Sequence, residues 1–398
     1  MSKYVQLGDI AKIYSGGTPS RTKPAYWGGN IPWVKTGQIQ NNLIREDSVD
    51  EWITQQGLKY SSAKMVPKGT ILMAMYGQGK TRGQVAILGL DAAINQACAA
   101  IDLGKESNRD FVFQQLLFRY NTIRSLSNTG GQENLNSGLI REIEILLPSL
   151  SEQAAIANLL SAWDQAIEKT GRLIASKEKY LSVLKQKLLT GKKRINGYNE
   201  SWQRYRLSKV LVEHGALSTG QEKVYSVSVH KGLVDQIEHL GRSFAAKNTA
   251  NYNLVKPGDI VYTKSPTGDF PYGIIKQSQL DYPVIVSPLY GVFTPKTKQL
   301  GSFLHFYFES PVNIGNYLRP LIQKGAKNTI GISNSTFLTN SLFLPPCDDE
   351  TEAIAATLRA TRQEIDLLKK QADTYRKQKR GLMQKLLTGR WRVKIHRG

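Results

Sequence analysis

Apolar side chains recur at alternating steps of four and three residues through a long segment in the middle of the chain. The series occupies these positions: Ile156, Leu160, Trp163, Ile167, Ile174, Leu181, Leu184 and Leu188, with Thr170 and Lys177 completing the phase. This is the spacing of the a and d positions of a coiled coil, in which one stripe of a long helix packs against a partner. The pattern therefore predicts an uninterrupted helix of about ten turns.

The same segment occurs a second time. Residues 148–195 align without a gap to residues 346–393, and both copies contain the hexapeptide QKLLTG, at Gln186–Gly191 and at Gln384–Gly389. The second apolar series has the same phase: Ile354, Leu358, Ile365, Leu368, Ala372, Tyr375, Leu382 and Leu386, with Thr361 and Lys379 as its exceptions. A unit repeated twice at this length is too long for a solenoid. It predicts two globular units, each followed by the same long helix.

Both predicted helices have marked ends. A capping pair precedes each helix and a glycine follows it: Ser149 and Glu152 with Gly191 in the first copy, and Asp349 and Glu352 with Gly389 in the second. The first helix leads the chain away from the first unit and the second starts at the second unit, so pairing their seams requires an antiparallel arrangement. About 40 residues at 1.5 Å each give a rod of about 60 Å. A coiled coil between two separate chains is the alternative.

The two globular segments share a sequence plan. Corresponding landmarks are the segments 7–10 and 207–210, the turns 66–72 and 255–261, the strands 84–88 and 273–276, and amphipathic helices near 111–125 and 303–318. Mixed strands and helices with many turns predict an α+β fold. The predicted domains are 1–147, a first spacer helix 148–196, a second domain 197–345, and a second spacer helix with a basic tail 346–398. The loops differ almost completely between the copies, so two different surfaces are expected.

The chain has a large excess of basic residues. The 398 residues include 53 Lys and Arg against 32 Asp and Glu, a formal net charge of +21. Such an excess favours a polyanionic partner, usually nucleic acid. Cys98 and Cys347 are too far apart in the sequence to suggest a metal site or a disulfide framework. The start of the chain does not read as a leader and no apolar run reaches membrane-spanning length, so a cytoplasmic protein is expected.

A search for catalytic motifs favours binding over chemistry. Gly79-Lys80-Thr81 imitates the end of a P-loop, but the motif requires glycine where this chain has Ala74, and a strand rather than a helix is expected to follow. No nucleophile elbow or histidine–carboxylate cluster is apparent in the sequence. Asp164 and Glu178 belong to the predicted coiled coil, where they would form no pocket. We therefore expect a recognition protein that is not an enzyme and binds no cofactor or metal itself.

Several motifs resemble one known family. They are Ser15–Ser20, Tyr26-Trp27, Ile31–Gly37, Gly130–Asn136 and the exit segment Leu147–Gln153. Together with the duplicated helix, they resemble the target-recognition domains and spacer helices of type I restriction-modification specificity subunits. The likeness covers nearly the whole chain. The second domain departs from it in one place, where Ser218–Gln221 replaces the opening glycine-rich segment.

The resemblance implies a non-catalytic subunit that reads a bipartite, asymmetric DNA target, one half-site per domain. The helical pair would set the gap, and a rod of about 60 Å corresponds to one to two turns of B-DNA at ~34 Å per turn. The family further implies two modification (methyltransferase) subunits docked on the helices, joined by restriction (translocase and nuclease) subunits. S-adenosylmethionine, ATP and Mg²⁺ would then be bound by those partners.

Candidate base and phosphate contacts are polar or basic loop residues, since these pair with groove edges and backbone. The first domain offers Arg21, Lys23, Lys35, Thr36, Gln38, Gln78, Lys80, Arg82, Gln132 and Asn134. The second offers Lys231, Lys264, Ser265, Thr267, Lys324, Lys327 and Asn328. For each, an ordinary solvated side chain is the competing interpretation. Trp27, Trp33 and Trp202 are expected in the cores.

Basic residues on the predicted helices form a separate group. They are Lys185, Lys187, Lys192, Lys193, Arg194, Arg376, Lys377, Lys379 and Arg380. They would contact DNA backbone between the half-sites, or else form a polar helix face or a docking surface for a partner. Two functional alternatives also stay open: a stand-alone nuclease or methyltransferase with unfamiliar motifs, and a basic coiled-coil adaptor without sequence preference.

Overall fold

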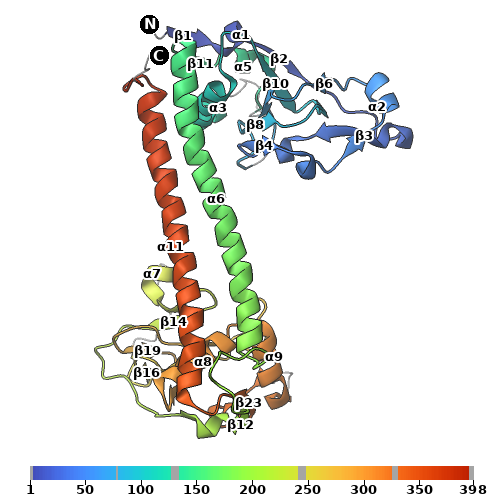
Figure 1. Cartoon of the computed structure of the whole chain (residues 1–398). Helices are drawn as coiled ribbons and strands as arrows, with labels where there is room; N and C mark the ends of the chain where they lie inside the picture. Colours follow the sequence, from blue (N-terminus) through green and yellow to red (C-terminus); the bar gives the residue numbers. More distant parts are fainter. Residues whose placement is uncertain (1–2, 78, 127–133, 241–247, 325–329, 394–398) are drawn as a thin grey trace. The chain divides into compact units, whose positions relative to one another are not determined.

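The computed structural model describes residues 3–77, 79–126, 134–240, 248–324 and 330–393. It divides into two compact units, unit 1 with residues 1–171 and 370–398, and unit 2 with residues 172–369. Two long helices, α6 (Leu150–Leu188) and α11 (Asp348–Leu386), each contribute one half to each unit. The predicted α+β class is confirmed, since each unit combines mostly antiparallel sheets with helices (Figure 1).

Unit 1 is built on a five-stranded sheet with the order β2-β10-β7-β8-β4. A second sheet has the order β5-β3-β9-β6, and β1 pairs with β11. The strands are β1 (Lys3–Gln6), β2 (Ala11–Ser15), β3 (Trp27–Val34), β4 (Asn42–Ile44), β5 (Trp52–Ile53), β6 (Met65–Val66), β7 (Ile71–Ala74), β8 (Val85–Leu88), β9 (Ala92–Ile94), β10 (Cys98–Leu103) and β11 (Glu144–Leu147). The helices are α1 (Leu7–Ile10), α2 (Gln55–Lys59), α3 (Arg109–Phe118), α4 (Tyr120–Ser125) and α5 (Ser137–Arg141), with 3-10 turns η1 (Pro24–Tyr26), η2 (Thr36–Gln38) and η3 (Glu46–Ser48).

Unit 2 repeats the strand order of the main sheet, with four strands in place of five. Its main sheet is β13-β20-β17-β18, which corresponds to β2-β10-β7-β8. The strands are β12 (Gln203–Arg206), β13 (Leu211–Val212), β14 (Tyr225–Ser228), β15 (Gly232–Asp235), β16 (Asn253–Val255), β17 (Ile260–Thr263), β18 (Ile274–Gln277), β19 (Val284–Val286), β20 (Gly291–Pro295), β21 (Gln323–Lys324), β22 (Ile330–Gly331) and β23 (Ser341–Leu344). The helices are α7 (Gln236–Leu240), α8 (Lys298–Tyr307), α9 (Pro311–Leu318) and α10 (Asn334–Phe337), with η4 (Leu207–Lys209) and η5 (Arg319–Leu321). The predicted duplication of the framework is confirmed.

The predicted seam is confirmed in both long helices. Every predicted a and d position is buried or half-buried, while most positions between them are exposed. In unit 1, Trp163 of α6 meets Tyr375 of α11 edge to face, with ring centroids 5.6 Å apart. In unit 2, Lys177 of α6 donates to Glu364 of α11 at 2.8 Å. Residue numbers rise along α6 while those of its partners on α11 fall, so the pair is antiparallel and forms within one chain.

The two polar residues in the seam of α11, Lys379 and Thr361, satisfy their polar groups in different ways. Lys379 is 8% exposed, and its ammonium donates to the Asp164 carboxylate of α6 at 2.6 Å. The ion pair compensates a charge that would otherwise be buried alone. Thr361 is half-buried and returns its hydroxyl to the carbonyl of Thr357 within its own helix.

The helix ends correct part of the sequence prediction. Ser149 Oγ accepts from the Glu152 amide at 3.4 Å, but the Glu152 carboxylate pairs with Arg392 rather than closing a capping box. The second predicted pair is wrong, because α11 begins at Asp348 and Asp349 therefore lies inside its first turn. The acidic residues of that turn suit the positive end of the helix dipole. The glycine stops are confirmed: Gly191 and Gly389 have φ of 68° and 73°.

The predicted helices near 111–125 and 303–318 are each two helices. In unit 2 the break falls at Ser310, whose hydroxyl accepts from the Asn313 amide, and Pro311 starts α9. Proline suits the first turn of a helix but cannot donate inside one. In unit 1 the break falls at Arg119, where the backbone leaves helical geometry between α3 and α4.

The hydrophobic cores connect the sheets to the long helices. In unit 2, the rings of Tyr262 and Phe293 both stack with the ring of Phe337, each with its centroid 4.9 Å from that of Phe337. The same core continues into the long helices through Leu184 and Leu358. Each half of the helix pair is therefore part of the folded core of its own unit.

Candidate nucleic-acid interface

The central hairpin of the main sheet occupies the same place in both units. In unit 1, β7 pairs with β8, and in unit 2, β17 pairs with β18, both antiparallel. The connecting loops, residues 75–84 and 264–273, hold many of the predicted contacts. A rigid hairpin that carries a variable loop is a common support for recognition residues.

The hairpin loop of unit 1 presents Lys80. The side chain is exposed, while the Lys80 carbonyl accepts a hydrogen bond from the Tyr120 hydroxyl at 2.6 Å. Gly77, Gly79 and Gly83 adopt positive φ, which turns the loop directly back into β8. The strand β8 follows Lys80, as the sequence predicted, where a P-loop would lead into a helix.

Arg82, in the same loop, has a different environment. Its side chain is only 8% exposed, and its guanidinium donates to the Arg124 carbonyl at 3.1 Å. This placement ties the loop to the end of α4. It supports a structural role for Arg82 more strongly than direct contact with a base.

The hairpin loop of unit 2 places Lys264, Ser265 and Thr267 in sequence. Ser265 and Thr267 are exposed, and Thr267 exchanges two backbone hydrogen bonds with Phe270, at 2.8 and 3.1 Å. Lys264 is half-buried; burial lowers its pKa, and the nearby Glu213 carboxylate acts in the opposite direction. Lys231 is exposed in the turn between β14 and β15. These four side chains form the candidate surface of unit 2.

A cluster around Glu51 organises the second candidate surface of unit 1. The Glu51 carboxylate receives Lys35 Nζ at 2.5 Å and Arg21 at 2.6 Å. Arg21 also stacks over the Trp27 ring, with its guanidinium carbon 3.7 Å from the ring centroid. The pKa of Glu51 is lowered: burial alone would raise it, but hydrogen bonds from Lys35 and Arg21 outweigh that effect. Glu51 therefore stays ionised and fixes two cations.

The remaining candidates of this segment are partly structural. Gln38 is buried, and its side-chain oxygen accepts from the Lys35 amide at 2.7 Å. Thr36 is half-buried in η2. Lys23 Nζ donates to the Tyr26 hydroxyl at 3.2 Å. Of the predicted tryptophans, Trp33 is 2% exposed, as expected for a core residue, whereas Trp27 is half-buried beneath Arg21.

Some predicted contacts fall outside the described residues: Gln78, Gln132, Lys327 and Asn328. Asn134 directly follows one such segment and is half-buried. Lys324 is the last residue of β21, which pairs with β22. All of these remain predictions.

Several basic residues of the helices already have partners in the protein. Lys379 pairs with Asp164, Arg194 with Glu350, Lys185 with Glu309, and Arg376 with Asp373. The first three pairs are partly buried and contribute to the fold, whereas Arg376 and Asp373 form an exposed pair within one helix. Trp202, beside Arg194, donates its indole N–H to Glu350 at 3.2 Å.

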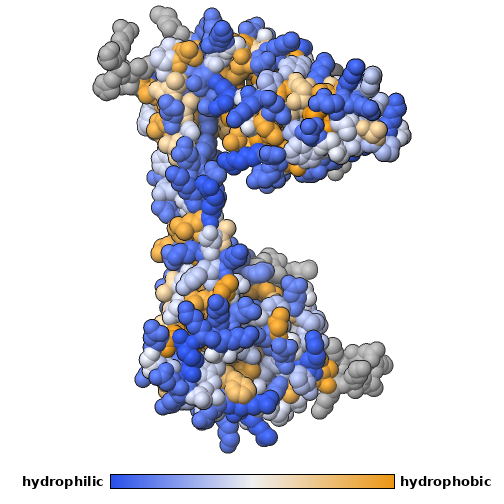
Figure 2. Space-filling model, turned by 45° about the vertical axis from the view of Figure 1, so that its right-hand side comes forward, coloured by the Kyte–Doolittle hydropathy of each residue, from blue (hydrophilic) through white to orange (hydrophobic). Residues whose placement is uncertain are grey.

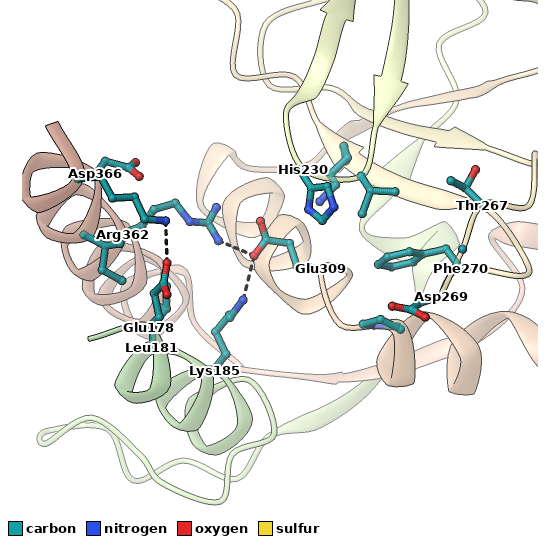
Figure 3. A pocket seen from close by; sticks show the side chains of 16 residues that line it. Glu178, Leu181, Lys185, His230, Thr267, Asp269, Phe270, Glu309, Arg362 and Asp366 are labelled. Atoms are coloured by element: carbon teal, nitrogen blue, oxygen red, sulfur yellow. Dashed lines mark hydrogen bonds and ion pairs between the residues drawn. The ribbon is translucent and has the colours of Figure 1, made fainter. Parts of the chain in front are cut away.

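Sequence reasoning missed a buried charge cluster in unit 2. Glu309 sits between α8 and α9, and it receives Arg362 at 2.5 Å and Lys185 at 3.2 Å (Figure 3). His305 also contacts this carboxylate, at 3.3 Å. Its pKa is lowered, because hydrogen bonds from His305 and Arg362 outweigh the burial that alone would raise it. The spacing of His305 and Glu309, four residues apart on predicted helix, is the one sequence signal that pointed here.

Hydrophilic side chains cover most of the visible surface of each unit (Figure 2). Within the described residues, no group of His, Cys, Asp and Glu has the arrangement of a metal site. No helix in that part of the chain is long and apolar enough to cross a membrane.

Known proteins with similar sequences are specificity subunits of type I restriction enzymes. Residues 2–176 match the family model of the type I restriction modification DNA specificity domain. A type I restriction enzyme specificity subunit of Escherichia coli is 28% identical over 164 residues, 40% of this chain and 40% of that protein. The chain thus spans about two-fifths of that relative. The MjaVIII specificity subunit of Methanocaldococcus jannaschii is 22% identical over 414 residues, 98% of this chain and 93% of the relative.

A solved structure shows the same fold along the whole chain. The type I restriction-modification S subunit from M. genitalium superposes with a TM-score of 0.59 at 15% identity, covering 97% of this chain and 96% of that one. In sequence over residues 2–176, and in fold over nearly its whole length, the chain is similar to type I restriction-modification specificity subunits.

Proposed function

We propose that this chain binds double-stranded DNA and selects an asymmetric, bipartite target for a type I restriction-modification complex. Unit 1 reads one half-site through Lys80, the cluster around Glu51 and their neighbours. Unit 2 reads the other through Lys231, Lys264, Ser265 and Thr267. The observation that carries the proposal is the repeated hairpin with unlike loops: one framework, used twice, presents two different sets of polar side chains.

Charge supports DNA as the partner. A formal net charge of +21 suits a phosphate backbone, and neutralising phosphates releases counterions, which contributes binding free energy without sequence preference. Sequence preference must then come from side chains that meet base edges. Exposed Lys, Ser and Thr side chains on the two hairpin loops have suitable hydrogen-bonding groups.

Partner subunits would supply the chemistry. We assign the outer faces of α6 and α11 to the docking of two modification subunits, with restriction subunits joining them. S-adenosylmethionine, ATP and Mg²⁺ would be bound by those partners. The exposed apolar side chains of the long helices, among them Leu159, Leu173 and Leu367, are available for such docking.

Methylome sequencing tests the proposal. Cells that express the modification subunits with this chain should carry methylated sites with two unlike half-sites at a fixed gap, and cells without the chain should lack them. Methylation of a single continuous or palindromic motif would contradict the bipartite reading. Unchanged methylation after removal of the chain would contradict the function as a whole.

A binding assay distinguishes sequence recognition from general affinity for DNA. The purified full chain with its modification subunits is titrated onto a duplex carrying the mapped target, and then onto one with a scrambled half-site. We expect at least tenfold weaker binding to the scrambled duplex, since each lost base pair costs about 1–3 kcal/mol. Equal affinity would indicate a basic adaptor without sequence preference.

A further inference from the structure

Unit 2 contains a cavity between its hairpin loop and the two long helices. Its volume is about 700 Å³, and it is lined from α6, α11, β18 and the loop that carries Thr267. Arg362 and Lys185 reach Glu309 at its wall from two different helices (Figure 3). Lys276 of β18 also lines the cavity. Three cationic side chains therefore share the neighbourhood of one buried carboxylate.

Lys276 is the unusual member. The side chain is 5% exposed, yet it makes no hydrogen bond or ion pair with any residue that the structure describes. Burial lowers its pKa, while the Glu309 charge acts to raise it. An ammonium withdrawn from water costs free energy unless it is paired. The Glu309 carboxylate, already engaged by Arg362, Lys185 and His305, has little capacity left.

We propose that Lys276, together with Lys185 and Arg362, forms a binding site for a phosphate group in this cavity. The geometry leaves donors for it, because Lys185 and Arg362 each donate one hydrogen bond to Glu309, while an ammonium has three N–H groups and a guanidinium has five. A phosphate presents several strong acceptor oxygens and would compensate the excess positive charge.

Three more carboxylates line the cavity, and they occupy a different environment from Glu309. Asp269 and Asp366 are both exposed, so water and salt screen their charges. Glu178 lines the cavity as well and is paired with Lys369 at 2.7 Å. The site therefore combines one buried and two half-buried cations with a screened acidic mouth. The acidic mouth weakens phosphate binding without abolishing it.

The phosphate has two possible sources. It belongs either to a small phosphate-bearing molecule or to the backbone of the DNA bound by the adjacent hairpin loop. The second source rests on the proposed function, and the first does not. A phosphate from either source would contact the base of the loop that holds Thr267.

The first experiment uses inorganic phosphate as the probe. The full chain is titrated with phosphate at pH 7 by calorimetry, with ionic strength held constant by sodium chloride. We expect saturable binding that weakens at least tenfold in Lys276→Met, and strengthens about twofold in Asp366→Asn, the scale of a surface charge effect. Lys256→Met, which changes an exposed lysine of the same unit away from the cavity, should bind like wild type.

The second experiment measures DNA affinity against salt concentration. If the phosphate belongs to DNA, Lys276→Met lowers the slope of log affinity against log salt by about one. If the phosphate belongs to a small molecule, the slope is unchanged and only the calorimetric signal is lost. Circular dichroism checks that Lys276→Met folds. If it does not, the same measurements are made on Lys276→Gln.

The results separate the proposal from the proposed function. Wild-type protein without saturable phosphate binding, combined with an unchanged salt slope in the variants, overturns the site. So does phosphate binding that Lys276→Met and Lys276→Gln leave intact. A chain that binds phosphate through Lys276 but does not select DNA would retain the site and refute the proposed function.

Discussion

Arg194 donates two hydrogen bonds, at 2.5 and 2.7 Å, to the carboxylate of Glu350, which is wholly buried at the start of α11. Arg392 and Glu152 form the corresponding pair in unit 1, at 2.6 Å, and both residues of each pair stand 198 positions from their counterparts. In each unit, the tail that follows one long helix returns to the first turn of the other. Within each unit, the duplicated pair therefore ties the two long helices together.

Loss of Arg194 should destabilise unit 2. Arg194→Ala leaves the Glu350 carboxylate buried without its cation, and the free energy of unfolding should fall by about 3 kcal/mol. The urea midpoint of unit 2, followed by tryptophan fluorescence, reports the change because Trp202 also contacts Glu350. Arg392→Ala is the matched control. Arg392 is far more exposed, so its loss should cost less. Equal effects would contradict the role assigned to burial.

The ion pair inside the seam of unit 1 should respond unequally to loss of its two members. Asp164→Ala leaves the ammonium of Lys379 buried without its anion and should lower stability by about 2 kcal/mol. Lys379→Met places an apolar side chain of similar length in the seam and should be neutral or stabilising. The double variant should recover most of the loss. Thermal melting of all three proteins checks this order, and Lys379→Met as the most damaging change would contradict it.

The long helices could be predicted from sequence because their apolar positions repeat with a period that only a helix brings to one side. Ile156, Leu160 and Leu358 are all essentially inaccessible, as the phase required. The hairpins could be predicted too, since Gly69 and Gly258 each precede an apolar strand and both adopt positive φ. These features depend on neighbours close in sequence, where local pattern carries the information.

The contacts of the candidate sites could not be predicted in the same way. Glu51 meets Arg21, which lies 30 residues earlier in the sequence. Glu309 meets Lys185 and Arg362, which belong to two different helices. No local pattern distinguishes a cation held by such a partner from one in free solution. For the same reason, Arg82 and Gln38 were expected to be accessible contacts, whereas both are buried. Only the assembled sheet decides which loop residues stay on the surface.

Stability of unit 2 should depend on pH through Glu309. Its folded-state pKa lies below the unfolded value, so the stabilisation is present above the ordinary carboxyl pKa, about 4.3, and is lost as pH falls further. The urea midpoint should therefore decline below about pH 4.5 in wild-type protein. Glu309→Gln should flatten this decline while lowering the midpoint at pH 7. Glu364→Gln, which changes an exposed partner of Lys177, should leave the slope nearly unchanged.

Glu51 should act as a positioning residue for the unit 1 surface. Glu51→Gln removes the charge that holds Arg21 and Lys35, and affinity for the first half-site should fall about tenfold while the second half-site is read as before. A gel shift with duplexes mutated in one half-site at a time separates these effects. Glu46→Gln is the control, since Glu46 belongs to the neighbouring turn η3 and forms no ion pair within the described residues. Equal weakening at both half-sites would indicate a general loss of structure.

Finally, Lys80 and Lys264 should each affect one half-site. Lys80→Ala should weaken binding to the half-site read by unit 1, and Lys264→Ala to the other, because each lies on the hairpin loop of its own unit. Each lost phosphate contact should also reduce the salt slope by about one. Lys105→Ala and Lys256→Ala remove exposed lysines outside these loops and serve as controls. Circular dichroism is needed most for Lys264→Ala, whose side chain is half-buried. Normal target affinity in both loop variants would show that the hairpin loops do not contribute to target recognition.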